Sequence, residues 1–508
     1  FWLKLSFAPR PRRPSLHPFP STEMSMASVA SRAAVVAALQ VAVGATDPLL
    51  RRLQATNSTD DQKAALEEEE EHAPDIASTN MYVVAILVTV AVVTGISVVI
   101  DRMRVKEVHG SGLWTASLKV MSYLLLIPGI SHILYHYNVA LSFFGQTWKI
   151  RGGTETMLQL IRDLHSNNCT FAAVIITFYA IFIPAAKVIM LAIGLCWQNS
   201  VSPTRVTWSR RCLIVVQKVS KWASPDMFAY ILMMYLFREV NHPPSVLSDM
   251  TMDVGFTCFC VFCVGSTVSA LGIRIPAKPV SDVTTPKTPA RTYVAMAKRT
   301  AAAVVVLTVL FFVSLAFGIA LASMSLKMDM DLFYSEQPSL KAFKAYIDGV
   351  HLDELVHAEV SIWNCVVSLA RWLFSGELNS GVAFVMYVVF VLLLSACDML
   401  AMSVAAIQLC QSTGAAAASK ALAASRVLGR ISMLDVSVVG VLVIVLAMQD
   451  LRKKGITVSL EIGIVPLSAA AICQYLAFFL VRRASLASLE IEIDSKIADA
   501  EKVGNAQA

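Results

Sequence analysis

Charged residues are scarce in this sequence of 508 residues, where they make up 15% of the chain. A soluble protein carries about a quarter, so the composition argues against a soluble enzyme. Hydrophobic residues make up 56%, and they gather in runs of about 20, each long enough to cross the hydrocarbon layer of a membrane. The net charge of +6 is mild. Cytoplasmic loops of membrane proteins are rich in Lys and Arg, so this excess indicates no nucleic-acid partner.

Recognisable catalytic motifs are also missing. The sequence has no Gly-rich phosphate loop, no nucleophile elbow and no carboxylate pair beside a base, so we expect neither an enzyme nor a cofactor. The ten cysteines show no zinc-ribbon spacing, and the one Cys-x-x-Cys, from Cys260 to Cys263, lies inside an apolar run. A thiol there behaves as a small hydrophobic group. We therefore expect no metal centre.

Two histidines end the second apolar run. His132 and His136 are four residues apart, a spacing at which two imidazoles on one helix face can share a metal ion. No Cys or acid nearby completes a ligand set, and Tyr135 and Tyr137 alternate with them. We therefore interpret the group as an aromatic belt at the membrane surface.

The N-terminal region has features of a targeting segment. Residues 1–45 include the stretch Met26–Arg32, which ends in a cation, and then an apolar stretch ending in small residues, an order typical of a secretory signal peptide. An organelle transit peptide is the alternative, because residues 1–40 are rich in Arg and Ser. Residues 46–80 are acidic and predict a disordered lumenal segment, with a glycosylation sequon at Asn57. The expected location is the secretory pathway or plasma membrane, with an organelle envelope as the alternative.

We predict an all-α, polytopic membrane protein, because lipid leaves no partner for a sheet edge. Nine apolar runs are candidates for transmembrane helices: 82–100, 117–137, 169–194, 224–240, 254–273, 300–322, 381–408, 431–449 and 463–481. Arg102 and Arg104 follow the first run, so its N-terminus should face the lumen or exterior. Alternation then places the basic stretches near 205–221, 274–299 and 420–430 in the cytoplasm. The basic cluster Arg452–Lys454 is the main exception on the opposite side.

Part of the sequence repeats. Lys221–Asp226 aligns with Arg430–Asp435 at the start of two spans, and upstream Pro184–Lys187 aligns with Ser395–Asp398. The duplication covers four spans twice, so both halves should cross the membrane in the same direction. The predicted organisation is a targeting region (1–45), an acidic lumenal segment (46–80), a first transmembrane helix and cytoplasmic loop (81–116), module 1 (117–274), a cytoplasmic linker (275–299), module 2 (300–482) and a cytoplasmic amphipathic tail (483–508).

These repeated stretches resemble the paraquat-inducible protein A family. The segment Gly429-Arg430-Ile431-Ser432-Met433-Leu434-Asp435-Val436 is similar to that family's Gly-Arg-Trp-Ser-Met-Leu-Asp-Val signature, with Ile431 in place of Trp. Module 1 keeps Lys221, Trp222 and Asp226, and Pro184 with Lys187 matches the family's Pro-x-x-Lys. Two departures stand out. The family's Cys-x-x-Cys zinc ribbons are missing, and the second module has Ser395 and Asp398 instead of Pro-x-x-Lys.

The resemblance implies a role in lipid transport or membrane maintenance. Membrane lipids are then the expected partners, together with a separate lipid-transfer protein, since no such domain is fused to this chain. The site we expect is a polar cleft between the modules, with Lys187, Asp226 and Asp435 near its cytoplasmic mouth. A non-transporting scaffold and an ion or small-solute transporter are the alternatives.

Simpler structural roles remain open for each of these residues. Asp226 and Asp435 could cap helices, because each lies in the first turn of a span and Ser432 with Asp435 has capping-box spacing. Pro225 would then occupy the first helical position before Asp226. Lys187 could extend along its helix to the cytoplasmic phosphates, as lysines near the ends of spans often do. Pro184 would kink that helix.

Overall fold

The computed structural model describes residues 76–507, apart from 104–111, 144–145, 168, 244, 274, 277–289, 331, 333, 335–355, 411–414 and 449–455. The expected targeting region and the Asn57 sequon lie outside the described residues, as does most of the expected linker. The side chains of 487–507 also lie outside them, although this segment is part of a continuous helix, α21.

From Ile76 onward, the described part of the first half consists of a long helix followed by further helices and three strands. In chain order its elements are α3 (Ile76–Met103), α4 (Leu113–Ser131), β1 (Ile133–Phe143), β2 (Gln146–Thr156), α5 (Met157–Ser166), α6 (Thr170–Thr177), the π-helical η1 (Phe178–Phe182), α7 (Ile183–Trp197), α8 (Pro203–Val219), the 3₁₀ turn η2 (Ser220–Ala223), α9 (Pro225–Glu239), β3 (Val246–Met252) and α10 (Val254–Leu271).

The second half has nearly the same order of elements. They are α11 (Ala290–Ala320), β4 (Ala322–Met328), β5 (Ala358–Ser361), α15 (Ile362–Phe374), α16 (Leu378–Val385), the π-helical η5 (Met386–Leu393), α17 (Leu394–Cys410), α18 (Ala415–Ile431), α19 (Leu434–Ala447), β6 (Ile456–Leu460) and α21 (Ile464–Gln507). α4 to α10 thus correspond to α11 to α21, and a π-helical segment interrupts the same helix in each half.

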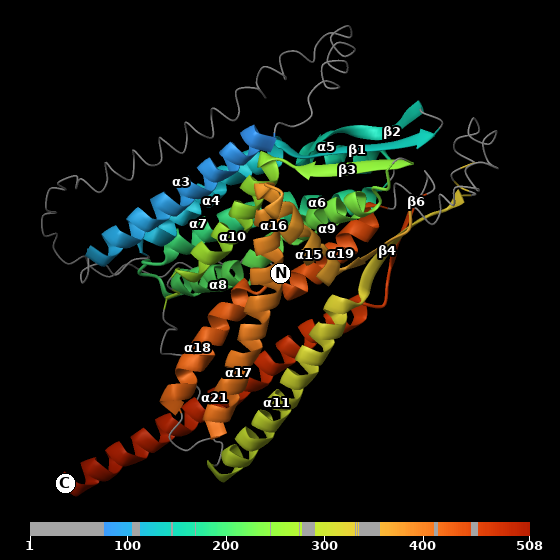
Figure 1. The fold of residues 1–508 in the computed structure, drawn as a ribbon. Helices are drawn as coiled ribbons and strands as arrows, with labels where there is room; N and C mark the ends of the chain where they lie inside the picture. Colours follow the sequence, from blue (N-terminus) through green and yellow to red (C-terminus); the bar gives the residue numbers. More distant parts are fainter. Residues whose placement is uncertain are drawn as a thin grey trace, which may run out of the picture.

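Eight helices among the described residues are long and apolar enough to cross a membrane. Seven of them correspond to seven of the nine runs expected from the sequence. The eighth, Lys420–Ala447, includes most of the expected run 431–449 at its C-terminal end. The run 224–240 differs, because it forms α9, which has only 15 residues and is buried along most of its length. In Figure 1, α3, α4, α7, α8 and α10 form one group of helices, and α11, α17, α18 and α21 form another.

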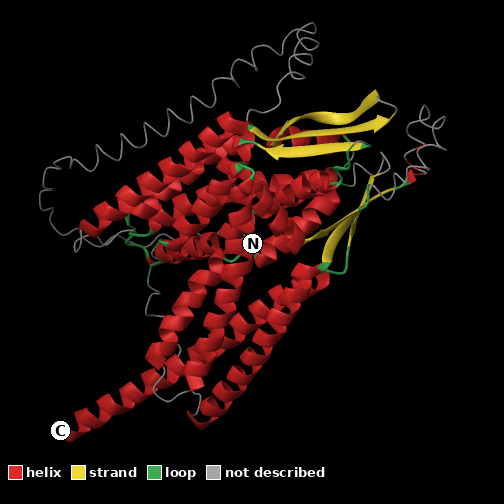
Figure 2. Cartoon of the chain, in the orientation of Figure 1, coloured by secondary structure: helices red, strands yellow, loops and turns green. Residues whose placement is uncertain are grey.

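In the described ranges, six strands form two three-stranded sheets, which the apolar runs did not predict. The strand orders are β2-β1-β3 and β5-β4-β6, with antiparallel neighbours throughout. Both sheets lie at one end of the helices (Figure 2). By the predicted orientation this is the lumenal end, outside the lipid, where a sheet edge can meet water.

The second predicted span was therefore wrong at its C-terminal end. α4 ends at Ser131 and β1 begins at Ile133, so His132 and His136 do not share a helix face. Instead, His136 Nε2 lies 3.0 Å from the Asp253 carboxylate on the loop between β3 and α10. The expected aromatic belt is here part of a sheet: Tyr135 and Tyr137 both donate hydrogen bonds to Glu155 of β2.

Helices α9 and α19 form the centre of the molecule. Each is nearly surrounded by protein, and they pack against each other between the two groups of spans. Gly440 of α19 allows the close approach, because a Cβ atom there would lie 2.8 Å from Phe228 Cβ and 3.0 Å from the Pro225 carbonyl oxygen. One continuous hydrophobic core includes residues of both halves. The two halves therefore form one packed body.

Candidate functional site

In each half, the helical segment that leads to the centre of the molecule is broken at the same place. In the first half, α8 ends, η2 turns, and α9 starts at Pro225, which has no amide hydrogen to continue the α8 ladder. In the second half, α18 ends at Ile431 and α19 starts at Leu434. Helix ends leave backbone groups without helical partners, so both breaks expose polar groups inside the molecule. We call the region around these two breaks the junction.

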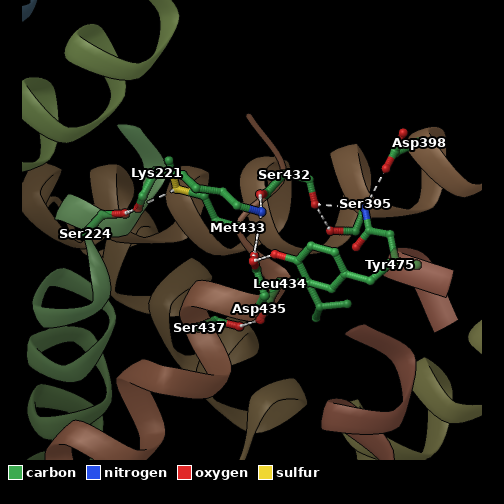
Figure 3. Close-up of polar contacts among 11 residues, drawn as sticks. Lys221, Ser224, Ser395, Asp398, Ser432, Met433, Leu434, Asp435, Ser437 and Tyr475 are labelled. Atoms are coloured by element: carbon green, nitrogen blue, oxygen red, sulfur yellow. Dashed lines mark hydrogen bonds and ion pairs between the residues drawn. The ribbon is translucent and has the colours of Figure 1, made fainter. Parts of the chain in front are cut away.

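An ion pair crosses the junction. Lys221 Nζ of η2 lies 2.8 Å from Asp435 Oδ2 of α19, and both side chains are about nine-tenths buried. Tyr475 of α21 donates its hydroxyl to the same carboxylate, and its ring lies 5.5 Å from the ammonium group. Figure 3 shows these side chains pointing toward one another between the halves. Asp435 thus has a cation and a hydroxyl as partners.

Both acids lie in the first turns of their helices, as expected, but the expected capping box of Ser432 with Asp435 is not formed. Neither α9 nor α19 has a side-chain hydrogen bond at its N-cap, which is Ser224 in one and Met433 in the other. Ser432 instead lies 2.7 Å from the Ser395 hydroxyl of α17. The expectation that Pro225 occupies the first helical position is confirmed.

Lys187 of α7 points into the protein. Its Nζ donates to the Ser266 hydroxyl of α10 at 2.9 Å and to the Ser220 carbonyl oxygen at 3.3 Å, and 1% of the residue is exposed. Ser266 lies five residues before the end of α10, about 7.5 Å along the helix axis. The hypothesis that Lys187 extends to the membrane surface was therefore wrong. Pro184 lies in the first turn of α7, directly after the π-helical η1.

The second half has an acid where the first has this lysine. Asp398 of α17 accepts hydrogen bonds from Ser425 and from Gln474 of α21, both at 2.7 Å. The partners correspond as well. Ser266 and Gln474 lie the same number of residues after Gly255 and Gly463, two glycines near the starts of α10 and α21 that pack against the backbone before or at β1 and β4. The two halves therefore have buried groups of opposite charge in equivalent places. The sequence alignment paired Lys187 with Asp398, but it gave no sign of Gln474 or Ser425.

Asp226 differs from the other buried charged groups. It lies in the first turn of α9, 1% of it is exposed, and neither carboxyl oxygen has a hydrogen-bond partner in the described residues. Tyr179 of η1, Tyr230 of α9 and Cys263 of α10 lie close enough to interact electrostatically with it. Burying a carboxyl group without a hydrogen-bond partner costs free energy.

The three expected site residues thus lie near the two breaks, but they do not form one contact. Asp435 pairs with Lys221, Lys187 bonds to serine and backbone oxygens, and Asp226 is unpaired. The expected cleft between the modules is closed by the packing of α9 on α19. Of the family-signature residues, Gly429 lies against Asp398, with an added Cβ 3.0 Å from Oδ2.

The remaining signature residues have structural contacts. Met433 donates its amide to the Phe390 carbonyl oxygen of η5. Trp222 packs on the hydrophobic core, and Arg430 lies half-buried at the end of α18.

A second set of polar contacts joins the halves at the predicted lumenal end. Arg238 of α9 makes a bidentate pair with Glu377, at 2.9 and 3.0 Å, and its guanidinium lies over the Trp372 ring. Asn379 of α16 contacts Thr257 and donates to the Met252 carbonyl oxygen. Polar contacts therefore join the two halves at both ends of α9.

Buried polar groups also occur under the first sheet. The Tyr135 hydroxyl lies 2.9 Å from Glu155, and burial together with this carboxylate raises the pKa of Tyr135 well above its usual range. The phenol therefore stays protonated and remains a donor. The second half has the apolar Met324 and Val360 at the matching sheet positions.

Comparison with known proteins agrees with these features. Residues 124–274, which contain the first sheet, Lys187, Lys221 and Asp226, match the family model of paraquat-inducible protein A. The chain is an integral membrane protein by its apolar helices, and its residues 124–274 are similar to paraquat-inducible protein A. This confirms the resemblance found in the sequence, and the match covers the first of the two halves. No curated protein and no solved structure matches the chain.

Proposed function

We propose that this protein takes part in lipid transport or membrane maintenance, and that the junction is where it handles lipid headgroups. In this proposal the two halves are a duplicated pair of paraquat-inducible protein A-type modules, and the protein is not an enzyme. Membrane lipids are its ligands, and a separate lipid-transfer protein is its partner.

The unpaired Asp226 carboxyl supports the proposal most strongly. Ionisable groups inside a membrane protein are costly and are usually retained for a function. Asp226 has no hydrogen bond that would account for it as part of the scaffold. The energetic cost of burying this carboxyl is explained if the junction also adopts an open form in which the carboxyl contacts a polar ligand.

The chemistry of the junction suits a phospholipid headgroup. Lys187 supplies an ammonium group for a phosphate, and its partners in the structure are neutral oxygens and the Phe262 ring. Asp226 supplies a carboxylate for a headgroup amine. The π-helical segments η1 and η5 precede Lys187 and Asp398, and such segments often occur at functional sites. Opening would require Lys221 and Asp435 to separate.

Reconstituted vesicles test this function. We expect the wild-type protein to move fluorescent phospholipids, and Asp226→Asn and Lys187→Met to reduce the rate at least tenfold. Glu359→Gln, an exposed acid of β5 outside the junction, is the matched control and should keep the wild-type rate. Lipid movement that is unchanged in both junction variants would refute the assignment of the site.

A non-transporting scaffold is the second candidate, and one observation favours it. The halves are fastened at both ends of α9, by Lys221 with Asp435 and by Arg238 with Glu377. A scaffold does not require Lys221 and Asp435 to separate. It predicts that the wild-type protein moves no lipid in the same vesicles.

A further inference from the structure

Helix α8 has an exposed face that the junction does not use. Arg205, Trp208, Arg211, Val215 and Lys218 follow one another at intervals of three or four residues, so they share one side of the helix. All five are exposed, whereas Ser209, Leu213 and Val216 on the opposite side are buried. The exposed face therefore combines three cations with an aromatic and an aliphatic side chain.

The cations on this face have no ion-pair partner in the part of the chain that the structure describes. From residue 199 to residue 225 the sequence contains no Asp or Glu. Among the described residues, none of the three cations forms an ion pair. The Arg211 guanidinium instead lies over the Trp208 ring, 5.7 Å from the ring centre. An unbalanced basic face of this kind calls for an anionic ligand from outside the chain.

The depth of α8 indicates what that ligand is. The Gln217 amide donates to the Ala270 and Ile273 carbonyl oxygens, at the predicted cytoplasmic end of the α10 span. Arg210, two turns earlier in α8, donates to the Pro276 carbonyl oxygen beyond that end. Trp208 and Arg211 therefore lie at the level of the lipid headgroups. Exposed Trp is typical of this zone, and the cytoplasmic leaflet supplies negative charge there.

The second half lacks these features at the equivalent helix. The exposed positions of α18 are Lys420, Ala423, Ala424, Arg426 and Val427, with no aromatic side chain among them. The face is therefore a property of α8 and not of the repeated module.

We propose that the α8 face, defined by Arg205, Trp208, Arg211, Val215 and Lys218, binds anionic phospholipid headgroups of the cytoplasmic leaflet. The three cations contact phosphates, while Trp208 and Val215 lie at the boundary with the acyl chains. This site is separate from the junction and does not depend on lipid movement.

Quenching of Trp208 by brominated lipids tests the proposal. The full chain is reconstituted in phosphatidylcholine vesicles containing either brominated phosphatidylglycerol or brominated phosphatidylcholine. The Trp208 signal is the difference between wild type and Trp208→Phe, which removes the contribution of the other tryptophans. Both leaflets hold the brominated lipid, so the orientation of the protein does not matter.

We expect Trp208 to be quenched at a lower mole fraction of the anionic lipid than of the zwitterionic one. Each Lys or Arg near an anionic surface contributes on the order of a fivefold preference. The triple variant Arg205→Gln, Arg211→Gln, Lys218→Gln should lose the preference, and Lys420→Gln with Arg426→Gln should keep it. High salt should weaken the preference when the cations are all in place, a measurement that needs only the Trp208→Phe reference.

Two results would overturn the proposal. Equal quenching of Trp208 by both brominated lipids would mean that the face has no headgroup preference. Quenching by aqueous acrylamide, with no effect of either brominated lipid, would place the face in water and favour an acidic protein partner.

Discussion

Lys221 and Asp435 join the two halves of the protein by an ion pair of 2.8 Å. In the sequence repeat, Lys221 aligns with Arg430 and Asp435 with Asp226. The equivalent pair between Arg430 and Asp226 is not formed in the described residues, where Asp226 has no hydrogen-bond partner. Two aspartates at matching positions thus have opposite roles. One fastens the halves together, and the other is buried without a counter-charge.

Asp435→Asn should destabilise the protein. The substitution leaves the Lys221 ammonium group buried without its carboxylate, at a cost of about 3 kcal/mol. Thermal unfolding in mild detergent measures the change as a lower midpoint. The double variant with Lys221→Gln should lose less than the sum of the single variants, because the two residues act on one interaction. Additive losses would show that the pair is not coupled.

Asp226→Asn should leave the unfolding midpoint unchanged or raise it. No hydrogen bond is lost, and a carboxyl that is costly to bury becomes a neutral amide. Lipid movement should nevertheless fall, as expected where a destabilising group is kept for function. A midpoint as low as that of Asp435→Asn would instead assign Asp226 a structural partner.

Gly440→Ala should loosen the contact between α9 and α19. The added methyl group would lie 2.8 Å from Phe228 Cβ and 3.0 Å from a backbone oxygen, so the helices must move apart. Overpacking of this kind costs about 1–3 kcal/mol. Gly95→Ala is the matched control, because nothing lies within 4 Å of the new Cβ on α3. Equal midpoints for both variants would argue against close packing at Gly440.

Arg238→Lys tests the fastening at the predicted lumenal end. Lysine cannot make the bidentate pair with Glu377 or stack flat on Trp372, so the free energy of unfolding should fall by about 2 kcal/mol. The same change at Arg371, an exposed residue of α15, should have no measurable effect on thermal unfolding. A similar loss at both positions would show that the Arg238 contacts contribute no special stability.

The membrane-spanning helices could be predicted from the sequence, because runs of apolar residues long enough to cross lipid are a strong signal. The strands could not. The alternating residues of β1 follow α4 directly, and Leu134, Tyr135 and Tyr137 merely lengthened its apolar run. β2 follows β1 closely, but the other partner, β3, is distant in sequence, so its pairing with β1 leaves no local pattern.

The candidate site was predictable residue by residue but not as an arrangement. The repeat identified Asp226 and Asp435, and the resemblance identified Lys187. The pairing of Asp435 with Lys221 depends on how two halves about 200 residues apart pack together. Gln474 and Ser425, which hold Asp398, belong to no motif and were missed.

If the junction handles lipid, lipids should remain bound to the purified protein. Wild-type protein and the Asp226→Ala, Asp435→Ala double variant are purified in mild detergent, and the bound lipids are identified by mass spectrometry. A folded double variant that selectively loses phospholipid relative to wild type is the predicted result. Identical lipid profiles that mirror the bulk membrane would contradict a lipid-handling junction and favour the scaffold.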